Sequence, residues 1–433
     1  MKKFMFLLIG FLVLLSCTKD DDPISPNDPP SDEIITAQNI FDFRNANLNF
    51  SHKIFREIVD QTTTDQNIMI SPISISIALS MLNNGAANNT KDEIKTVLEY
   101  QNVPDYCINK LFLQLAQKLD SLNTIIDLDL INSAWFDNDF PVKQTFIDVN
   151  KEYFDAEIRN LDLDVNAAID TINTWVSNKT DGKIQDILDY SAVGAEFFLI
   201  NAINFQGFWK FPFDAEETEN SVFHNEDGTN QSVLTMHDNG VSVDAPSKKF
   251  EYFITDSLRA VKMPYGNPDL RETGKDVSMY VFVPTGDLKP FIETELTTEN
   301  WNSWMGSFVP FADAFPAYEL EFYFSLPKFK FGFESNLIPI LQALGMTDAF
   351  IENIADFSFI TDAWEGLFIF LAKHKSYIDV NEEGTSAAAV TVIGGSYGSP
   401  PPEFEVDKPF FFAIRDDLTG TILFMGQVYD PQY

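Results

Sequence analysis

The sequence holds few side chains whose types and spacing could do chemistry. None of its four histidines stands in the H-x-x-x-H or C-x-x-C spacing typical of zinc sites. Residues 162–166 begin like a calcium loop, but Ala167 replaces the glycine of the turn and Asn173 replaces the bidentate glutamate. No nucleophile elbow, phosphate loop or dinucleotide fingerprint occurs. The sequence therefore predicts no metal site, no cofactor and no enzyme.

The stretch with the most unusual chemistry reads as a substrate and not as a catalyst. Residues 379–402 are D-V-N-E-E-G-T-S-A-A-A-V-T-V-I-G-G-S-Y-G-S-P-P-P, and they carry no charge after Glu383. Ser399 has proline beside it and no positioned base, so we interpret it as part of a cleavable segment. Counting in twos from Thr385 places only small or β-branched side chains on one face of a strand. We therefore expect an exposed loop that becomes a strand of a sheet once it is cut.

Residues 382–391, E-E-G-T-S-A-A-A-V-T, resemble the hinge of the reactive-centre loop of inhibitory serpins. A helical turn or a linker is the alternative for such an alanine-rich run, but further matches follow in unbroken order over residues 37–433. They are Ser71-Pro72 with Gly85-Ala86 and Thr90, Ile172-Asn173-Thr174-Trp175, residues 198–209, Met263-Pro264-Tyr265, Leu326-Pro327-Lys328-Phe329, Leu344-Gly345-Met346, Lys408-Pro409-Phe410 and residues 422–426. The chain therefore resembles a serpin, a serine protease inhibitor.

The resemblance implies an α+β serpin fold in one large domain, residues 37–433. It would have a main mixed sheet, further sheets, about eight or nine helices and an exposed reactive-centre loop at about residues 382–402. The periodicities agree, because residues 45–60 and 109–119 have helical spacing and residues 318–324 alternate as a half-buried strand. Ser71 and Pro72 predict the start of a buried helix, with Ser71 as its cap.

The resemblance also implies a mechanism. A protease attacks the loop, and the freed segment inserts into the main sheet before the acyl-enzyme is hydrolysed. The hinge residues that this implies are Glu382, Glu383, Gly384, Thr385, Ala387, Ala388, Ala389 and Thr391. The residues that match the shutter, the network beneath the opening sheet, are Ser71, Ser74, Asn201 and His374. Trp209 matches the breach, where insertion begins.

The reactive bond follows from the family's spacing. Counting from Glu382, and back from the motif at residues 408–410, places it at Gly398-Ser399, with Tyr397-Gly398 as the alternative. Residues 384–402 contain no Lys or Arg, so a trypsin-like protease is not the expected target. Tyr397, one residue before Gly398, suits a papain-like cysteine protease, whereas a chymotrypsin-like or subtilisin-like enzyme could cut at Tyr397-Gly398. We favour a papain-like target or a broad-specificity subtilisin-like or elastase-like one. The expected partner is therefore a serine protease or a papain-like cysteine protease.

The first residues resemble a bacterial lipoprotein signal. Two lysines, an apolar run and the tetrapeptide Leu14-Leu15-Ser16-Cys17 are similar to a signal peptide, residues 1–16, that ends in a lipobox. This implies lipid on Cys17; ordinary cleavage beside an incidental cysteine is the alternative. An acidic and proline-rich tether, residues 17–36, follows. We expect a bacterial outer-membrane lipoprotein, surface-exposed or extracellular, that contacts the membrane through its anchor only.

Composition limits the partners further. A formal net charge of −36 opposes binding to nucleic acid, heparin-like polyanions and anionic membranes. Cys107 is the one cysteine besides Cys17, which predicts a packed thiol and no internal disulfide. We expect a monomer. Two alternatives to inhibition are a non-inhibitory serpin that acts as a cell-surface binding module, and a surface-glycan-binding lipoprotein, which would not explain the ordered motifs.

Overall fold

The computed structural model describes residues 34–62, 65–122, 126–238, 250–266, 277–314, 323–384 and 403–433. Contacts divide the chain into residues 1–34 and 35–433, and every element below belongs to the second unit. The helices of the described residues are α1 (Ala37–Gln61), α2 (Pro72–Asn83), α3 (Asn88–Val97), α4 (Asp105–Asp120), α5 (Gln144–Phe154), α6 (Asn166–Lys179), α7 (Leu288–Thr294), α8 (Thr298–Met305), α9 (Phe311–Ala314) and α10 (Leu337–Ala343).

Helix α2 begins where the sequence predicts. The hydroxyl of Ser71 accepts a hydrogen bond from the backbone N–H of Ser74 (3.4 Å), and Pro72 occupies the first turn, where its missing N–H costs nothing. All 12 residues of the helix are buried. A helix that is apolar on most of its circumference can only be stable when it is packed on all sides, and α2 contacts α1, β4 and β16.

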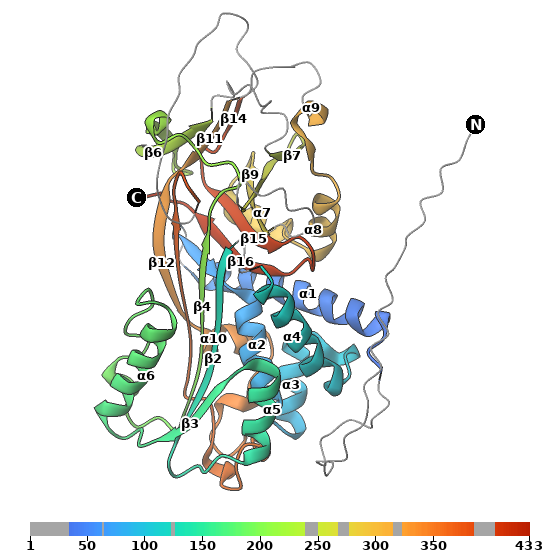
Figure 1. The fold of residues 1–433 in the computed structure, drawn as a ribbon, viewed down its shortest axis with the longest axis vertical. Coiled ribbons are helices and arrows are strands. Elements are labelled where there is room, and N and C mark those ends of the chain that lie inside the picture. The colour runs from blue at the N-terminus through green and yellow to red at the C-terminus, as the bar shows by residue number, and fades with distance from the viewer. Residues whose placement is uncertain are drawn as a thin grey trace, which may run out of the picture. The chain divides into compact units, whose positions relative to one another are not determined.

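A five-stranded sheet contains the two strands that flank the candidate site. Its order is β12 (Phe329–Asn336), β13 (Leu371–Val380), β4 (Phe197–Gly207), β2 (Ile126–Asp137) and β3 (Glu157–Leu161). In Figure 1 the sheet is seen nearly edge-on, with α6 on one face and α2, α3 and α5 on the other. Successive residues of a strand point to opposite faces. Trp135 accordingly packs in the apolar cluster with α6, whereas Phe136 belongs to the larger core on the other face.

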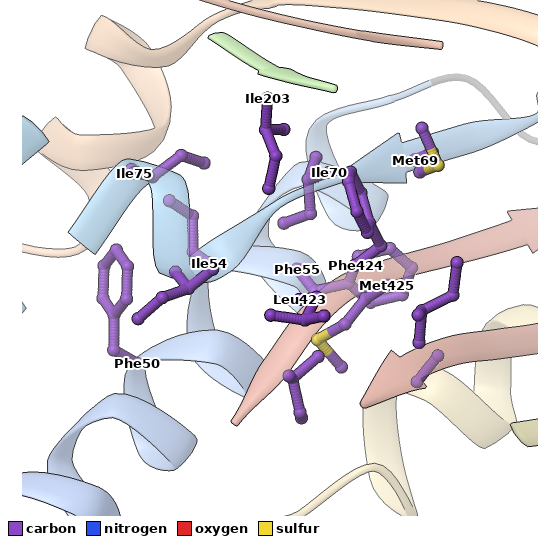
Figure 2. Packing of buried hydrophobic residues seen from close by; sticks show 14 of the residues in the cluster. Phe50, Ile54, Phe55, Met69, Ile70, Ile75, Ile203, Leu423, Phe424 and Met425 are labelled. Atoms are coloured by element: carbon purple, nitrogen blue, oxygen red, sulfur yellow. The ribbon is translucent and has the colours of Figure 1, made fainter. Parts of the chain in front are cut away.

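The larger core is built around a seven-stranded sheet. Its order is β1 (Ile68–Ile70), β16 (Ile422–Val428), β15 (Phe410–Asp416), β9 (Val277–Pro284), β8 (Leu258–Pro264), β7 (Glu251–Ile254) and β10 (Val309–Pro310). Every residue of β9 and of β16 is buried, which explains why apolar side chains follow one another along most of both strands and do not alternate with charged ones. Figure 2 shows side chains from α1, α2, β1, β4 and β16 packed together in this core. Cys107 is buried in α4, as predicted for a packed thiol.

A four-stranded sheet completes the fold. Its order is β14 (Glu403–Glu405), β11 (Tyr323–Pro327), β6 (Asn230–Asp238) and β5 (Glu219–His224). Strand β14 pairs in parallel with β11 and is the first described element after residues 385–402. The half-buried strand predicted at residues 318–324 lies mostly outside the described residues, and β11 begins at Tyr323. Three sheets with helices around them confirm the predicted α+β class.

Candidate hinge and strand-insertion site

Strands β13 and β4 pair in parallel at one end only. Their register joins Leu371–His374 to Phe198–Asn201, and within the described residues no pairing joins residues 375–380 to β4. On its other side β13 pairs with β12 along the whole of Phe329–Asn336, so β13 itself remains a regular strand to Val380. Strand β4 likewise pairs with β2 as far as Gly207. The sheet therefore has two facing strand edges whose backbone donors and acceptors can pair with a further strand.

The segment that leads into residues 385–402 starts at the unpaired end of these two strands. After β13, the backbone N–H of Trp209 donates to the carbonyl of Glu383 (2.6 Å), and the N–H of Phe213 donates to the carbonyl of Glu382 (2.8 Å). Gly384 forms a bridge with Phe208 and exchanges backbone hydrogen bonds with Asn381. These bonds hold the start of the predicted hinge against the end of β4.

Gly384 occupies a position that no other residue type fits. Its φ angle is +135°, a backbone conformation in which a side chain is strained. A Cβ atom added there would lie 2.1 Å from the carbonyl oxygen of Gly207, which cannot retreat because it belongs to β4. The predicted need for glycine at the hinge therefore has two causes, the φ angle and the close approach of another backbone.

A partly buried ion pair fastens the hinge to the neighbouring elements. The ammonium of Lys328 lies 2.9 Å and 3.0 Å from the two carboxylate oxygens of Glu382, and the Thr218 hydroxyl donates to the same carboxylate at 2.7 Å. Both charged side chains are 12% exposed. Burial alone would raise the pKa of Glu382, but the hydrogen bonds from Lys328 and Thr218 outweigh burial and hold that pKa below its usual range. Glu382 is therefore charged at neutral pH.

Lys328 is itself held from a second side. Its ammonium lies 4.0 Å from the ring centre of Tyr433, close enough for a cation–π contact. The backbone N–H of Lys330 donates to the carbonyl of Gln432 (2.8 Å), which fixes this last part of the chain beside β12. Tyr433, Lys328, Glu382 and Thr218 thus form a continuous contact chain to the hinge.

Trp209 packs where the hinge leaves the sheet. Its indole N–H donates to the carbonyl of Asn381 (2.9 Å), and its ring stacks on that of Tyr265 with centres 4.5 Å apart. The side chain is 1% exposed. Trp209 therefore lies directly under the turn that carries Gly384, at the place that the sequence assigned to the breach.

His374 lies at the last paired position of β13, over the start of α2. Its Nε2 accepts a hydrogen bond from the backbone N–H of Ser71 (3.2 Å). Burial lowers the pKa of His374 to about 4, so the ring is neutral at pH 7 and carries its proton on Nδ1. Two residues along the same face, the Ser376 hydroxyl donates to the carbonyl of Met69 (2.6 Å). These two contacts join the end of the ladder between β13 and β4 to β1 and α2.

For Ser74 and Asn201, two other predicted shutter residues, the structure describes the position but no side-chain hydrogen bond. Ser74 is buried beside Ser71, and its hydroxyl has no hydrogen-bond partner among the described residues. Asn201 lies opposite His374 in the register of β4 and β13, while its side chain lies outside the description. Asn201 is thus the last residue of β4 that pairs with β13, and Ser74 lies in the first turn of α2, next to the residue that contacts His374.

Several predicted site residues lie outside the described part of the chain. They are Cys17, Thr385, Ala387, Ala388, Ala389, Thr391, Tyr397, Gly398 and Ser399. Sequence reasoning in turn missed the contacts of Thr218, Lys328, Ser376 and Tyr433. A signal was present for two of them, because Lys328 belongs to a matched motif and Ser376 shares the face of His374 in period-2 counting.

The described residues offer neither a metal centre nor a membrane span. No group of three or more His, Cys, Asp or Glu side chains in these ranges could hold a metal ion. None of the helices in the described ranges is long and apolar enough to cross a bilayer.

The comparisons with known proteins agree with this architecture. The family model "Serpin (serine protease inhibitor)" matches residues 45–431. An uncharacterized serpin-like protein of Methanosarcina acetivorans is 32% identical, over 100% of this chain and 99% of that protein. Glia-derived nexin of Rattus norvegicus is 32% identical over 88% of this chain and 91% of its own.

Solved structures show the same fold. The native state of tengpin, a thermophilic serpin, matches with a TM-score of 0.77 at 27% identity, covering 93% of this chain and 97% of that one. The matching family model is that of serine protease inhibitors. The chain belongs to the serpin family.

Proposed function

We propose that this protein is a suicide-substrate inhibitor that traps a serine or cysteine protease as an acyl-enzyme. The observation that supports the proposal is the incomplete pairing of β13 with β4, with a glycine hinge at the unpaired end. A cut in residues 385–402 would free the segment after Gly384 to enter between these strands. Its backbone would then pair with residues 375–380 of β13 and with residues 202–207 of β4.

Trapping requires that insertion is faster than deacylation. A protease joined to the segment through its nucleophile would be carried along the sheet as insertion proceeds. Hydrolysis of the acyl-enzyme depends on an oxyanion hole and a positioned base, and a displacement of about 1 Å can cost on the order of 100-fold in rate. The small side chains on the proposed inward face, which begins at Thr385, enter without a steric or charge penalty.

The proposed reactive bond is Gly398-Ser399, with Tyr397-Gly398 as the alternative. Its protease would accept glycine or tyrosine before the cut, as broad-specificity subtilisin-like or elastase-like enzymes do, or would be papain-like. The peptide released in the covalent complex should begin at Ser399 or Gly398, as mass spectrometry can show. A first residue before Gly394 in a true complex would contradict the assignment.

The test is incubation with papain, subtilisin, elastase and chymotrypsin, followed by denaturing gel electrophoresis. An inhibitor gives a covalent complex that survives denaturation. Thr385→Arg should abolish the complex and leave a cleaved substrate, because an arginine would have to be buried as insertion begins. Ser386→Arg is the matched control, since its side chain would point to the other face, and it should still give complex.

Two outcomes would refute the proposal. Cleavage by all four enzymes without any complex would favour the non-inhibitory alternative, a cell-surface binding module. Equal yields of complex from Thr385→Arg and wild type would show that Thr385 does not enter the sheet.

We also propose that the chain acts outside the cell, attached by lipid on Cys17 to a bacterial outer membrane. The support is the resemblance of residues 1–17 to a lipoprotein signal and the acidic, proline-rich tether that follows. A tether of this composition would hold the inhibitor away from the membrane, where an extended loop can reach a protease.

A further inference from the structure

A pocket of about 120 Å³ lies between α1, α4 and the turn that joins β15 to β16. Figure 1 shows these three segments meeting below the labels β15 and β16. The lining residues of the pocket include none of the hinge, breach or shutter residues that the structure describes. Its apolar lining comes from Ile40, Phe43, Ile73, Leu111, Leu115 and Ile422.

The two neutral polar side chains that α1 contributes to this pocket, Asn47 and Ser51, already have partners. The side-chain oxygen of Asn47, Oδ1, accepts hydrogen bonds from the hydroxyls of Ser76 (2.7 Å) and Tyr100 (3.0 Å), and the side-chain amide N–H of Asn47 donates to the backbone carbonyl of Phe43 (2.9 Å). The Ser51 hydroxyl donates to the carbonyl of Asn47 (2.7 Å). A ligand in the pocket would leave these bonds intact, and the remaining charged or amide side chains of the lining, Arg44, Gln114 and Lys118, are exposed at its rim. The interior therefore suits an apolar body.

The rim of the pocket has the opposite charge to the protein. The chain holds 65 acidic and 29 basic residues, yet Arg44 and Lys118 line the pocket and no Asp or Glu does. By contrast, the pocket between α6 and residues 185–190 includes Asp170, Asp186 and Asp189. Among the ion pairs of the described residues, neither Arg44 nor Lys118 takes part in one. Both side chains are exposed, so they can turn toward a bound anion.

We propose that this pocket binds a small carboxylate with an apolar body, either one aromatic ring or a short acyl chain. The apolar part would occupy the lining, and the carboxylate would lie between Arg44 and Lys118. An apolar cavity of about 150 Å³ in another protein holds benzene, so a single ring is a reasonable upper size here. Charge-assisted hydrogen bonds to Arg and Lys distinguish a carboxylate from a neutral molecule of the same shape. This site is separate from the proposed inhibitory function and does not depend on it.

The test compares benzoate with benzyl alcohol, its neutral analogue, by calorimetric titration of the full chain after removal of the signal peptide. We expect benzoate to bind with a dissociation constant on the order of 1 mM, as its few heavy atoms allow, and benzyl alcohol to bind at least several-fold more weakly. The melting temperature should rise with benzoate concentration, because the ligand binds the folded state only.

Three variants locate the binding. Arg44→Met with Lys118→Met should weaken benzoate about 10-fold through the loss of two charge-assisted bonds, while Lys151→Met, an exposed lysine on α5, should change nothing. Leu48→Phe should fill the half-buried side of the pocket and weaken both ligands. The proposal fails if benzyl alcohol binds as tightly as benzoate, if the double variant binds benzoate like wild type, or if no heat is measured at about ten times the expected dissociation constant.

Discussion

At the scale of single residues, the hinge depends on charges that lie far apart in sequence. Glu382 and Lys328 are separated by 54 positions, and each is mostly buried when they meet. Removing one partner of such a pair leaves the other charge without compensation in a poorly solvated place. The ion pair should therefore determine how firmly the hinge stays against β4 before any protease arrives.

Lys328→Met tests this role. We expect a loss of about 2–4 kcal/mol in the free energy of unfolding, because Glu382 would remain charged and partly buried. Spontaneous loss of inhibitory activity on storage should also be faster. Urea unfolding and the yield of covalent complex after incubation are the measurements.

Lys330→Met provides the control for that variant. Lys330 also carries a cation close to Tyr433, but its own side chain is 49% exposed and its carboxylate partner, Asp379, is 3.7 Å away. A surface pair of this kind contributes at most about 1 kcal/mol. If both substitutions lower the free energy of unfolding equally, the ion pair between Lys328 and Glu382 contributes no more than an exposed ion pair.

His374 predicts a pH dependence. Its pKa in the folded protein is about 4, below the ordinary value of 6.5. The unfolded chain therefore binds a proton more readily, so stability is fully present above pH 6.5 and falls as the pH drops toward 4. Between pH 6.5 and pH 4 the free energy of unfolding should fall by an amount on the order of 2–3 kcal/mol.

Comparing wild type with His374→Gln isolates the contribution of His374 to this pH dependence. Glutamine keeps an acceptor for the backbone N–H of Ser71 but does not titrate. Burial also lowers the pKa of His52, to about 3, and this contribution is common to both proteins. The difference in unfolding free energy between wild type and variant, measured from pH 7.5 to pH 4.5, should shrink as the pH falls. A difference that stays constant would contradict the assigned role of His374.

At the scale of elements, β13 and β4 are paired more completely with their outer neighbours than with each other. Strand β13 is paired along its length with β12 but only over Leu371–His374 with β4. Strand β4 is paired with β2 over its whole length. Because both strands are held straight by their outer neighbours, a strand between them would find two preformed edges.

Cleavage within residues 394–399 should therefore stabilise the protein. New backbone hydrogen bonds worth about 1 kcal/mol each would raise the melting temperature by at least about 10 °C. Differential scanning calorimetry of intact and nicked protein measures this. Nicked Thr385→Arg should show a smaller rise, and an unchanged melting temperature in nicked wild type would leave no place for insertion.

At the scale of the whole molecule, one part of the chain is expected to attach it and another to inhibit. The unit that contains every helix and strand described above begins at residue 35, and the predicted anchor precedes it in the sequence. The strong negative charge of the chain opposes binding to an anionic membrane surface, so attachment should depend on the lipid and not on the surface of the domain.

Cys17→Ser should release the protein from the membrane fraction into the soluble fraction of a cell that expresses it. Metabolic labelling with a fatty acid should mark wild type and not the variant. Cys107→Ser is the matched control, because that thiol is buried in α4 and cannot reach an acyl donor. Retention of Cys17→Ser in the membrane at wild-type level would disprove the anchor.

Local patterns made much of the fold and part of the site readable from the sequence. Ser71 followed by Pro72 predicts a helix start, because capping and the tolerance for proline depend on neighbours within one turn; the burial of that helix was implied by the family resemblance. Gly384 was assigned to the hinge because residues 382–391 resemble the hinge of inhibitory serpins. The ordered motifs predicted the family that the comparisons then showed.

Only the tertiary structure decided how these parts meet. The pairing of Lys328 with Glu382, the contact of Tyr433 with Lys328 and the bond from Ser376 to Met69 join residues far apart in the chain, and no periodicity encodes them. The same holds for the end of the ladder at His374 and Asn201. Side-chain alternation shows which face of a strand is buried. The edges of the strand, however, carry the same backbone N–H and C=O groups whatever the sequence. Whether such an edge is paired or left for another strand therefore depends on what lies beside it in space.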